Sequence, residues 1–305
     1  MQPALLEEKL RRALRGFYIG DAFGAGREDG AQVSARANGT DAGSDAGIGA
    51  TDTIADTIGT WTENGDIVAI LASTVATNGV HWQPATIAAI RAWTVSGLAE
   101  IDKPPGNLSA VAKKVITSPG WHKDPAGTAK TATSSAPAHI ANINLPVATS
   151  IAFLCSPAAA IIEWASMFAH DPLTGSVAIF YVNALRASVA DNLPAYVDDM
   201  IKHAAGDQAA PVMLTFESIA ELAYKPLVQL DLGTRPLYSM TTLRVICYAL
   251  RIVHYARTCG RRPDLRRTLA HIASIAGSDA STNCAIAASI ICAGMNPVGY
   301  EQLWL

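Results

Sequence analysis

Large apolar residues recur at intervals of three and four positions over most of the chain, and no other feature of the sequence constrains the fold as much. A stripe with that period is the buried face of an amphipathic helix. The clearest stripes comprise Leu6, Leu10, Leu14 and Phe17, then Leu243, Ile246, Cys247, Leu250 and Val253, and finally Cys284, Ala287, Ile290 and Ile291. Alternating runs bounded by hairpin turns, which would indicate strands, are missing. The sequence therefore predicts an all-α fold, a compact bundle of many helices.

Composition supplies a thick core and gives no sign of a polyanionic partner. Half of the 305 residues are hydrophobic and 16% are charged, which is ample material for one core. The net charge is −3, whereas a protein that binds nucleic acid usually presents a basic face. We interpret the densest basic run, Arg261-Arg262 with Arg266-Arg267, as the solvated start of a helix. We therefore expect no nucleic-acid partner.

The sequence also predicts a cytoplasmic protein without a membrane segment. Charged residues interrupt the apolar stretch that a signal peptide would need near the start, namely Glu7, Glu8, Lys9, Arg11 and Arg12. The longest apolar runs, such as 147 to 160, contain Ser, Thr and Pro and fall short of the roughly 20 residues of a membrane span. The five cysteines have no CxxC spacing, which is typical of reduced thiols in a cytosolic protein.

Two stretches break the helical pattern. Residues 29–59 are rich in Gly, Ala, Asp and Thr, and residues 103–137 are punctuated by Pro and Gly. We predict flexible loops in both stretches, with one short helix from Leu108 to Ile116 in the second. Either loop is functional or disordered, and both readings stay open. The helices on both sides are needed for one core, so we predict a single domain over residues 1–305.

Polar side chains gather in three segments far apart in the sequence. The first, Arg15 to Gly24, reads RGFYIGDAFG and carries one acid, Asp21, among glycines that permit close backbone approach. The second, Trp61 to Asp66, reads WTENGD and precedes an apolar helix. The third, Ala276 to Asn283, reads AGSDASTN and also precedes a helix. In the last two, oxygen-bearing side chains cluster at a helix N-terminus, where acids are favourable, and we predict Thr62 as the N-cap of the second.

Together these segments resemble the ADP-ribosylglycohydrolase family. Its members have Gly-Asp-Ala-Leu-Gly at the end of a first helix, Thr-Asp-Asp-Thr at the start of a later one and Gly-Gly-Asp-Thr-Asp-Thr near the end. A fourth similarity is Ala169-His170-Asp171-Pro172, which is similar to the family's Thr-His-x-(Asp/His)-Pro segment. All four occur in the family's order. The resemblance implies an orthogonal multi-helix bundle of the ADP-ribosylglycohydrolase type.

The resemblance also implies a chemistry. Family members look like binuclear magnesium hydrolases that cleave the bond between C1″ of ADP-ribose and a modified side chain. Here the first Asp of the second motif is Glu63, the second is Asn64, and the second Asp of the third motif is Ser281. Two carboxylates, Glu63 and Asp279, remain of four. We therefore expect no family-type binuclear site, and no cofactor or at most one weakly bound Mg²⁺ at Thr62, Glu63, Asp279 and Thr282.

We predict Glu63 and Asp279 as the catalytic acid and base, since neighbouring carboxylates push one pKa upward. Alternatively, both residues are simply acids in the first turn of a helix, where they balance the helix dipole. The predicted substrate-binding residues are Asp21, Trp61, Asn64, His170 and Ser281. Structural roles compete with binding for three of them: a helix-end acid for Asp21, a hydrophobic staple for Trp61 and a helix terminus for His170.

Three functions follow. The first is a hydrolase that cleaves a glycosidic, ribosyl bond with a degenerate metal site. The second is a metal-independent lyase, dehydratase or cyclase that uses Glu63 and Asp279 on another small molecule. The third is a non-catalytic descendant that binds a ligand or serves structurally. Under each enzymatic reading the partner is a small molecule or an ADP-ribosyl-type ligand, and fold alone does not choose.

Overall fold

The computed structural model describes residues 3–38, 61–98, 103–104, 108–133, 144–152, 158–170, 172–190, 238–276 and 279–298. Within these ranges the elements are helices, and β pairing is limited to two isolated bridges, Leu98 with Lys103 and Asp264 with Val298. The helices are α1 (Pro3–Asn38), α2 (Glu63–Asn78), η2 (a 3-10 turn, Gly79–His81), α3 (Trp82–Ser96), α4 (Ala110–Thr117), α5 (Pro125–Thr133), α6 (Leu145–Ile151), α7 (Ala158–Trp164), α8 (Pro172–Ala190), α11 (Tyr238–Cys259), α12 (Leu265–Ala276) and α13 (Ala280–Gly294). The predicted all-α fold is confirmed.

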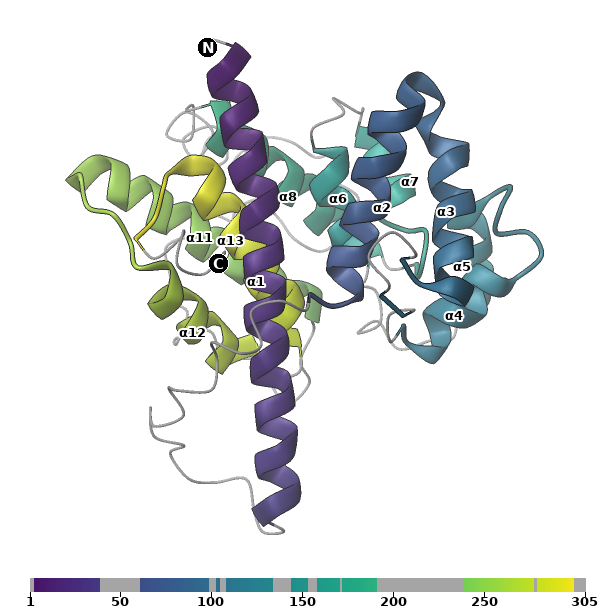
Figure 1. The fold of residues 1–305 in the computed structure, drawn as a ribbon, viewed down its shortest axis with the longest axis horizontal. Coiled ribbons are helices and arrows are strands. Elements are labelled where there is room, and N and C mark those ends of the chain that lie inside the picture. The colour runs from purple at the N-terminus through teal and green to yellow at the C-terminus, as the bar shows by residue number, and fades with distance from the viewer. Residues whose placement is uncertain are drawn as a thin grey trace.

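Among the described helices, α1 and α13 make the most extensive contact, and they lie side by side (Figure 1). Every residue of α13 from Ala280 to Ala293 is buried. The close approach depends on three glycines of α1 spaced four residues apart, each of which faces a backbone carbonyl of α13. A Cβ atom at Gly16, Gly20 or Gly24 would lie 2.6, 2.2 or 2.4 Å from the carbonyl oxygen of Ala288, Cys284 or Ala280. The glycines therefore fix the register of the two helices.

The other helices pack around this pair. Helices α8, α11 and α12 contact α13, while α2 packs against α3 and α6. A chain of three buried hydroxyl groups runs through the core between α6, α8 and α13: Thr149 Oγ1 lies 2.9 Å from the Tyr181 hydroxyl, which lies 2.7 Å from Ser289 Oγ. Burial raises the pKa of Tyr181 to about 12, so the hydroxyl stays protonated and can donate. These three hydroxyl groups are thus paired with one another inside the core.

Two loop predictions need correction. Helix α1 continues to Asn38, so the loop predicted from residue 29 does not begin there; residues 39–59 lie outside the described part of the chain. The second stretch contains the predicted short helix as α4, and it also contains α5, which was missed. Pro125 indicated a loop, but Pro is favourable in the first turn of a helix. Asp124 caps α5 by accepting a 2.8 Å hydrogen bond from the Gly127 amide.

Two of the described helices are long, α1 with 36 residues and α11 with 22. Among the helices that the structure describes, none combines the length and the apolar character that a membrane crossing requires.

Candidate functional site

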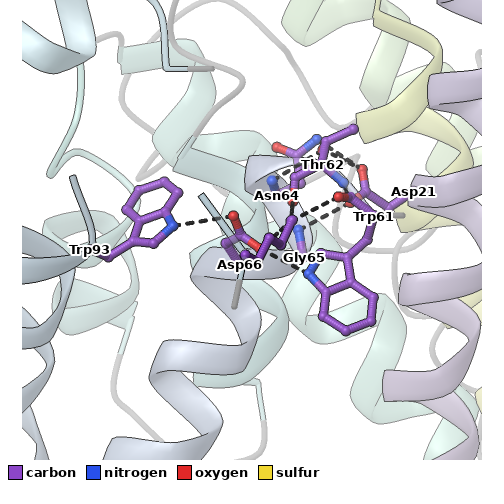
Figure 2. Close-up of polar contacts among 8 residues, drawn as sticks. Asp21, Trp61, Thr62, Asn64, Gly65, Asp66 and Trp93 are labelled. Carbon is purple, nitrogen blue, oxygen red and sulfur yellow. Dashed lines mark hydrogen bonds and ion pairs between the residues drawn. The ribbon is translucent and has the colours of Figure 1, made fainter. Parts of the chain in front are cut away.

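Asp21, in the middle of α1, holds the first turn of α2. Its side chain is fully buried. Oδ2 accepts from the Thr62 amide at 2.8 Å and the Gly65 amide at 3.1 Å. Oδ1 accepts from Thr62 Oγ1 at 2.7 Å and Asn64 Nδ2 at 3.2 Å. Figure 2 shows these contacts converging on one carboxylate. Burial raises the pKa of Asp21, and the hydrogen bonds from Thr62, Asn64 and Gly65 oppose that rise. Because all four partners donate, the geometry fits an ionised, acceptor-only carboxylate.

The sequence at the start of α2 dictates this local shape. Thr62 has extended backbone angles and its Oγ1 accepts a 3.2 Å hydrogen bond from the Asn64 amide, as an N-cap does. Gly65 follows because a Cβ there would lie 2.3 Å from the Trp61 ring. The predicted N-cap is therefore confirmed, and the glycine makes room for the indole.

A second buried acid, Asp66, ties α2 to α3 and to the segment at 103. Oδ1 accepts from Trp61 Nε1 at 2.8 Å and forms an ion pair with Lys103, while Oδ2 accepts from Trp93 Nε1 at 3.1 Å. Lys103 Nζ also donates to the Trp61 and Thr62 carbonyl oxygens, at 2.8 and 3.3 Å. We predicted no role for Lys103 or Trp93. Lys103 lies in a Pro-rich stretch and Trp93 in an apolar helix face, so neither carried a recognisable signal.

Trp61 is held from two sides. Its ring centroid lies 5.0 Å from that of Tyr18, and the Lys103 ammonium lies 5.3 Å from the indole centroid. Burial first, then the charges of Asp66 and Asp21, raise the pKa of Tyr18 above its ordinary value. These contacts give Trp61 a packing role beside the two acids. Ligand binding by Trp61 stays a prediction.

Asn64 joins α2 to α13. Its side-chain amide is buried, and Nδ2 donates to Thr282 Oγ1 at 3.2 Å and to Ser281 Oγ at 3.5 Å, besides its contact with Asp21. The structure thus brings together side chains from all three sequence segments, on α1, α2 and α13. This cluster around Asp21 contains four residues that the sequence predicts for the substrate or metal site: Thr62, Asn64, Ser281 and Thr282.

Glu63 is half-buried at the first position of α2. Burial raises the pKa of its carboxyl group, the negative charges of Asp21 and Asp66 raise it further, and the Lys103 ammonium opposes them. A carboxyl group in such surroundings tends to keep its proton and can then act as an acid.

Asp279 immediately precedes α13 and is half-buried. Its carbonyl oxygen and Oδ2 accept from Asn283 Nδ2, at 2.8 and 3.0 Å. Residues that lie close to Glu63 and Asp279 in the sequence are in direct contact. Asn64, which follows Glu63, donates from Nδ2 to Oγ of Ser281, two positions after Asp279. The two predicted catalytic carboxylates therefore flank one junction between two helix N-termini.

His170 stands at the end of a turn that α5 and α6 hold in place. Its backbone amide donates to Thr133 Oγ1 at 3.0 Å. Asn144 holds the same turn, accepting from the Phe168 amide at 2.9 Å and donating to the Ala169 carbonyl oxygen at 2.8 Å. These contacts fix the backbone of His170, whose predicted part in substrate binding stays a prediction.

Sequence comparison now decides the family. The ADP-ribosylglycohydrolase family model matches residues 2–296, nearly the whole chain. The chain belongs to the ADP-ribosylglycohydrolase family. No curated protein matches it in a direct comparison. The resemblance stated from the four motifs is therefore confirmed, and membership supports an ADP-ribosylglycohydrolase-like function at the level of the family.

The family implies a magnesium centre, and the described residues do not fit a binuclear one. Asn64 directs its Nδ2 group, which has no lone pair for a cation, at Asp21 and Thr282. The orientation follows from Asp21, because an ionised carboxylate accepts hydrogen bonds only. Thr62 Oγ1 donates a hydrogen bond to the same Asp21 carboxylate. Across the residues that the structure describes, no group of three or more His, Cys, Asp or Glu side chains is placed to hold a metal ion. Binding of one weak Mg²⁺ stays a prediction.

Proposed function

We propose that this ADP-ribosylglycohydrolase family member hydrolyses a glycosidic bond of an ADP-ribosyl or ribosyl ligand, with Glu63 and Asp279 in place of the family's metal centre. One observation carries the proposal: Glu63 lies half-buried at the motif position of a family carboxylate, beside two fully buried acids. The partner is accordingly a small molecule or an ADP-ribosyl-type ligand.

The reaction needs one proton donated and one removed. Glu63, whose pKa is raised by burial and by the acids beside it, would donate its proton to the leaving atom as the bond from C1″ breaks. A water molecule would attack C1″ and lose a proton to Asp279, the half-buried residue that would act as the base. The products are a free ribosyl hydroxyl at C1″ and the released group, and solvent exchange returns both carboxyl groups to their starting states.

Asp21 and Lys103 would act as positioning residues. Asp21 fixes the first turn of α2 through four hydrogen bonds. Lys103 donates to the carbonyl oxygens of the N-cap residue Thr62 and of Trp61, which precedes it. Rigid support of this kind keeps an acid within reach of its substrate.

The test is release of ADP-ribose from an ADP-ribosylated protein, followed by chromatography, once in chelator and once with Mg²⁺. We expect turnover in chelator, and a loss of kcat on the order of 10²–10⁴ for Glu63→Gln and for Asp279→Asn. Glu163→Gln, at an exposed position of α7, is the matched control and should keep the wild-type rate. Wild-type turnover in Glu63→Gln, or turnover that appears only with Mg²⁺, would refute the proposal.

A non-catalytic binding role is the second candidate, favoured by Asn64 and Ser281 at family carboxylate positions. Calorimetry separates the two candidates. ADP-ribose binding without any release from the ADP-ribosylated protein would establish binding alone, whereas absence of both would direct the search to a metal-independent lyase, dehydratase or cyclase acting on another small molecule.

A further inference from the structure

We infer that the Asn64 amide takes over the task of a bridging cation, linking α2 to α13 directly and making the geometry of this junction independent of divalent ions. The bridge holds whether or not the proposed hydrolysis occurs, because it concerns how three helices meet and not what they cleave.

The geometry places one small group between three helices. Asn64 Nδ2 has two hydrogen atoms, and its nearest acceptors are Asp21 Oδ1 of α1 and Thr282 Oγ1 of α13, both at 3.2 Å. Asn64, Asp21 and Thr282 are 4, 0 and 4% exposed, so water competes little for these bonds. A buried amide with both hydrogens used contributes to holding its neighbours in one arrangement.

Charge explains why an amide suits this position. Asp21 is a buried acid whose described partners are all neutral donors: two backbone amides, a hydroxyl group and the Asn64 side chain. A carboxylate at position 64 would set a second anion about 3 Å from Asp21 Oδ1, and neighbouring buried carboxylates cannot both ionise without a cation between them. Position 64 thus determines whether the junction needs a cation.

Thermal unfolding in chelator and in excess Mg²⁺ tests the inference without any activity assay. The wild-type melting temperature should be the same in both, whereas Asn64→Asp should melt lower in chelator by about 5 °C or more. Saturating Mg²⁺ or Mn²⁺ should restore most of that loss, because a ligand that binds only the folded state stabilises it. The double variant Asn64→Asp with Ser281→Asp should respond at lower Mg²⁺ concentration.

Two variants complete the design. Asn78→Asp makes the same amide-to-carboxylate change in α2, at an exposed residue whose Nδ2 donates to the Thr74 carbonyl oxygen, and it should gain no response to Mg²⁺. Asn64→Ala removes the bridge without adding charge, so it should melt lower than wild type and also ignore Mg²⁺.

A saturable, Mg²⁺-dependent rise in the wild-type melting temperature would overturn the inference. So would an Asn64→Asp protein that melts like wild type in chelator. Should Asn64→Asp fail to fold, the wild-type titration and Asn64→Ala still decide: a wild-type response to Mg²⁺, or an Asn64→Ala protein as stable as wild type, refutes the bridge.

Discussion

Gly20 is the position where a single added methyl group should do most damage to both the fold and the site. A Cβ there would lie 2.2 Å from the Cys284 carbonyl oxygen, 2.5 Å from its carbonyl carbon and 2.6 Å from the Ala285 nitrogen. All three are backbone atoms of a fully buried helix, so no side chain can rotate away. In Gly20→Ala, α1 must therefore retreat from α13 by roughly 1 Å, in a core that is packed to crystal-like density.

The expected loss has three parts. Overpacking of this kind costs about 1–3 kcal/mol, and alanine returns about 1 kcal/mol through its higher helix propensity. Asp21 follows Gly20 directly, so the retreat of α1 stretches its four hydrogen bonds to α2, and hydrogen bonds to a charged group contribute about 1.5–3 kcal/mol each. With one of these bonds lost, Gly20→Ala should lose about 1.5–5 kcal/mol of unfolding free energy.

Urea unfolding followed by circular dichroism measures that loss, and Gly175→Ala supplies the control. Gly175 is also inside a helix, α8, but a Cβ there would meet Ile162 Cγ2 at 3.4 Å, an ordinary contact. Replacing a helical glycine that has room should stabilise the protein by about 0.5–1 kcal/mol. The two variants make the same chemical change and should shift the midpoint in opposite directions.

If Gly20→Ala unfolds at the wild-type urea concentration, the helices are not as close as the structure has them, or the contact yields at no cost. A loss in Gly175→Ala as large as in Gly20→Ala would show that any added methyl in these helices is costly. Either result would refute the packing argument.

Three further predictions concern the acids of α2. Burial raises the pKa of Glu63 from its ordinary value near 4.5, so the folded state binds this proton more tightly than the unfolded state does. The unfolding free energy should therefore fall as pH rises through the raised pKa. The pKa of Asp21 is raised as well, so Asp21 contributes a pH dependence of the same sign. Glu63→Gln should match wild type in stability near pH 4 and exceed it at higher pH, and the difference should grow by at most about 1.4 kcal/mol per pH unit. Unfolding measured from about pH 4 to 8 checks this. An identical pH dependence of stability in both proteins would refute it. Lys103→Met leaves Asp66 without its cation and should cost about 2–4 kcal/mol in thermal unfolding, against no more than about 0.5 kcal/mol for the exposed Lys113→Met. Trp93→Phe removes a hydrogen-bond donor to Asp66 and should cost about 1–3 kcal/mol by the same measurement; wild-type stability would show that this bond contributes nothing.

Short sequence patterns correctly predicted several helices, one N-cap and the glycines at a close helix contact. The three- and four-residue spacing gave α11 and α13, because such a stripe must be buried somewhere. Thr62 was identified as an N-cap and forms one. The glycines around Asp21 were read as a site of close backbone approach, and Gly20 and Gly24 both touch the backbone of α13. The apolar stripes and the cap depend on residues within one or two turns, whereas the glycines indicated only that some backbone comes close and not that it belongs to α13.

What could not be predicted depends on partners distant in sequence. The oxygens of Asp66 face Trp61, Trp93 and Lys103, and no pattern in the sequence indicated these partners. Trp93 contacts Asp66 only because α2 and α3 pack against each other, and the spacing of apolar residues does not predict which helices pack together. The extent of α1 beyond residue 29 was missed for a different reason: small residues such as Ala are typical of loops in composition, yet Ala is also the strongest helix former.

The two buried acids of this site are neutralised in different ways, and the difference constrains what the site can accept. Asp66 has a cation, Lys103, besides its two indole donors, so its charge is balanced within the protein. Asp21 has only neutral donors among its described contacts, so its charge is spread by hydrogen bonding and not cancelled. A second anion next to Asp21 would be repelled, which favours neutral groups at positions 64 and 281 and favours a protonated Glu63. On this reasoning the neutral residues at positions 64 and 281 suit a buried anion whose described partners are all hydrogen-bond donors, and we expect an anionic group of a bound ligand to lie away from the first turn of α2.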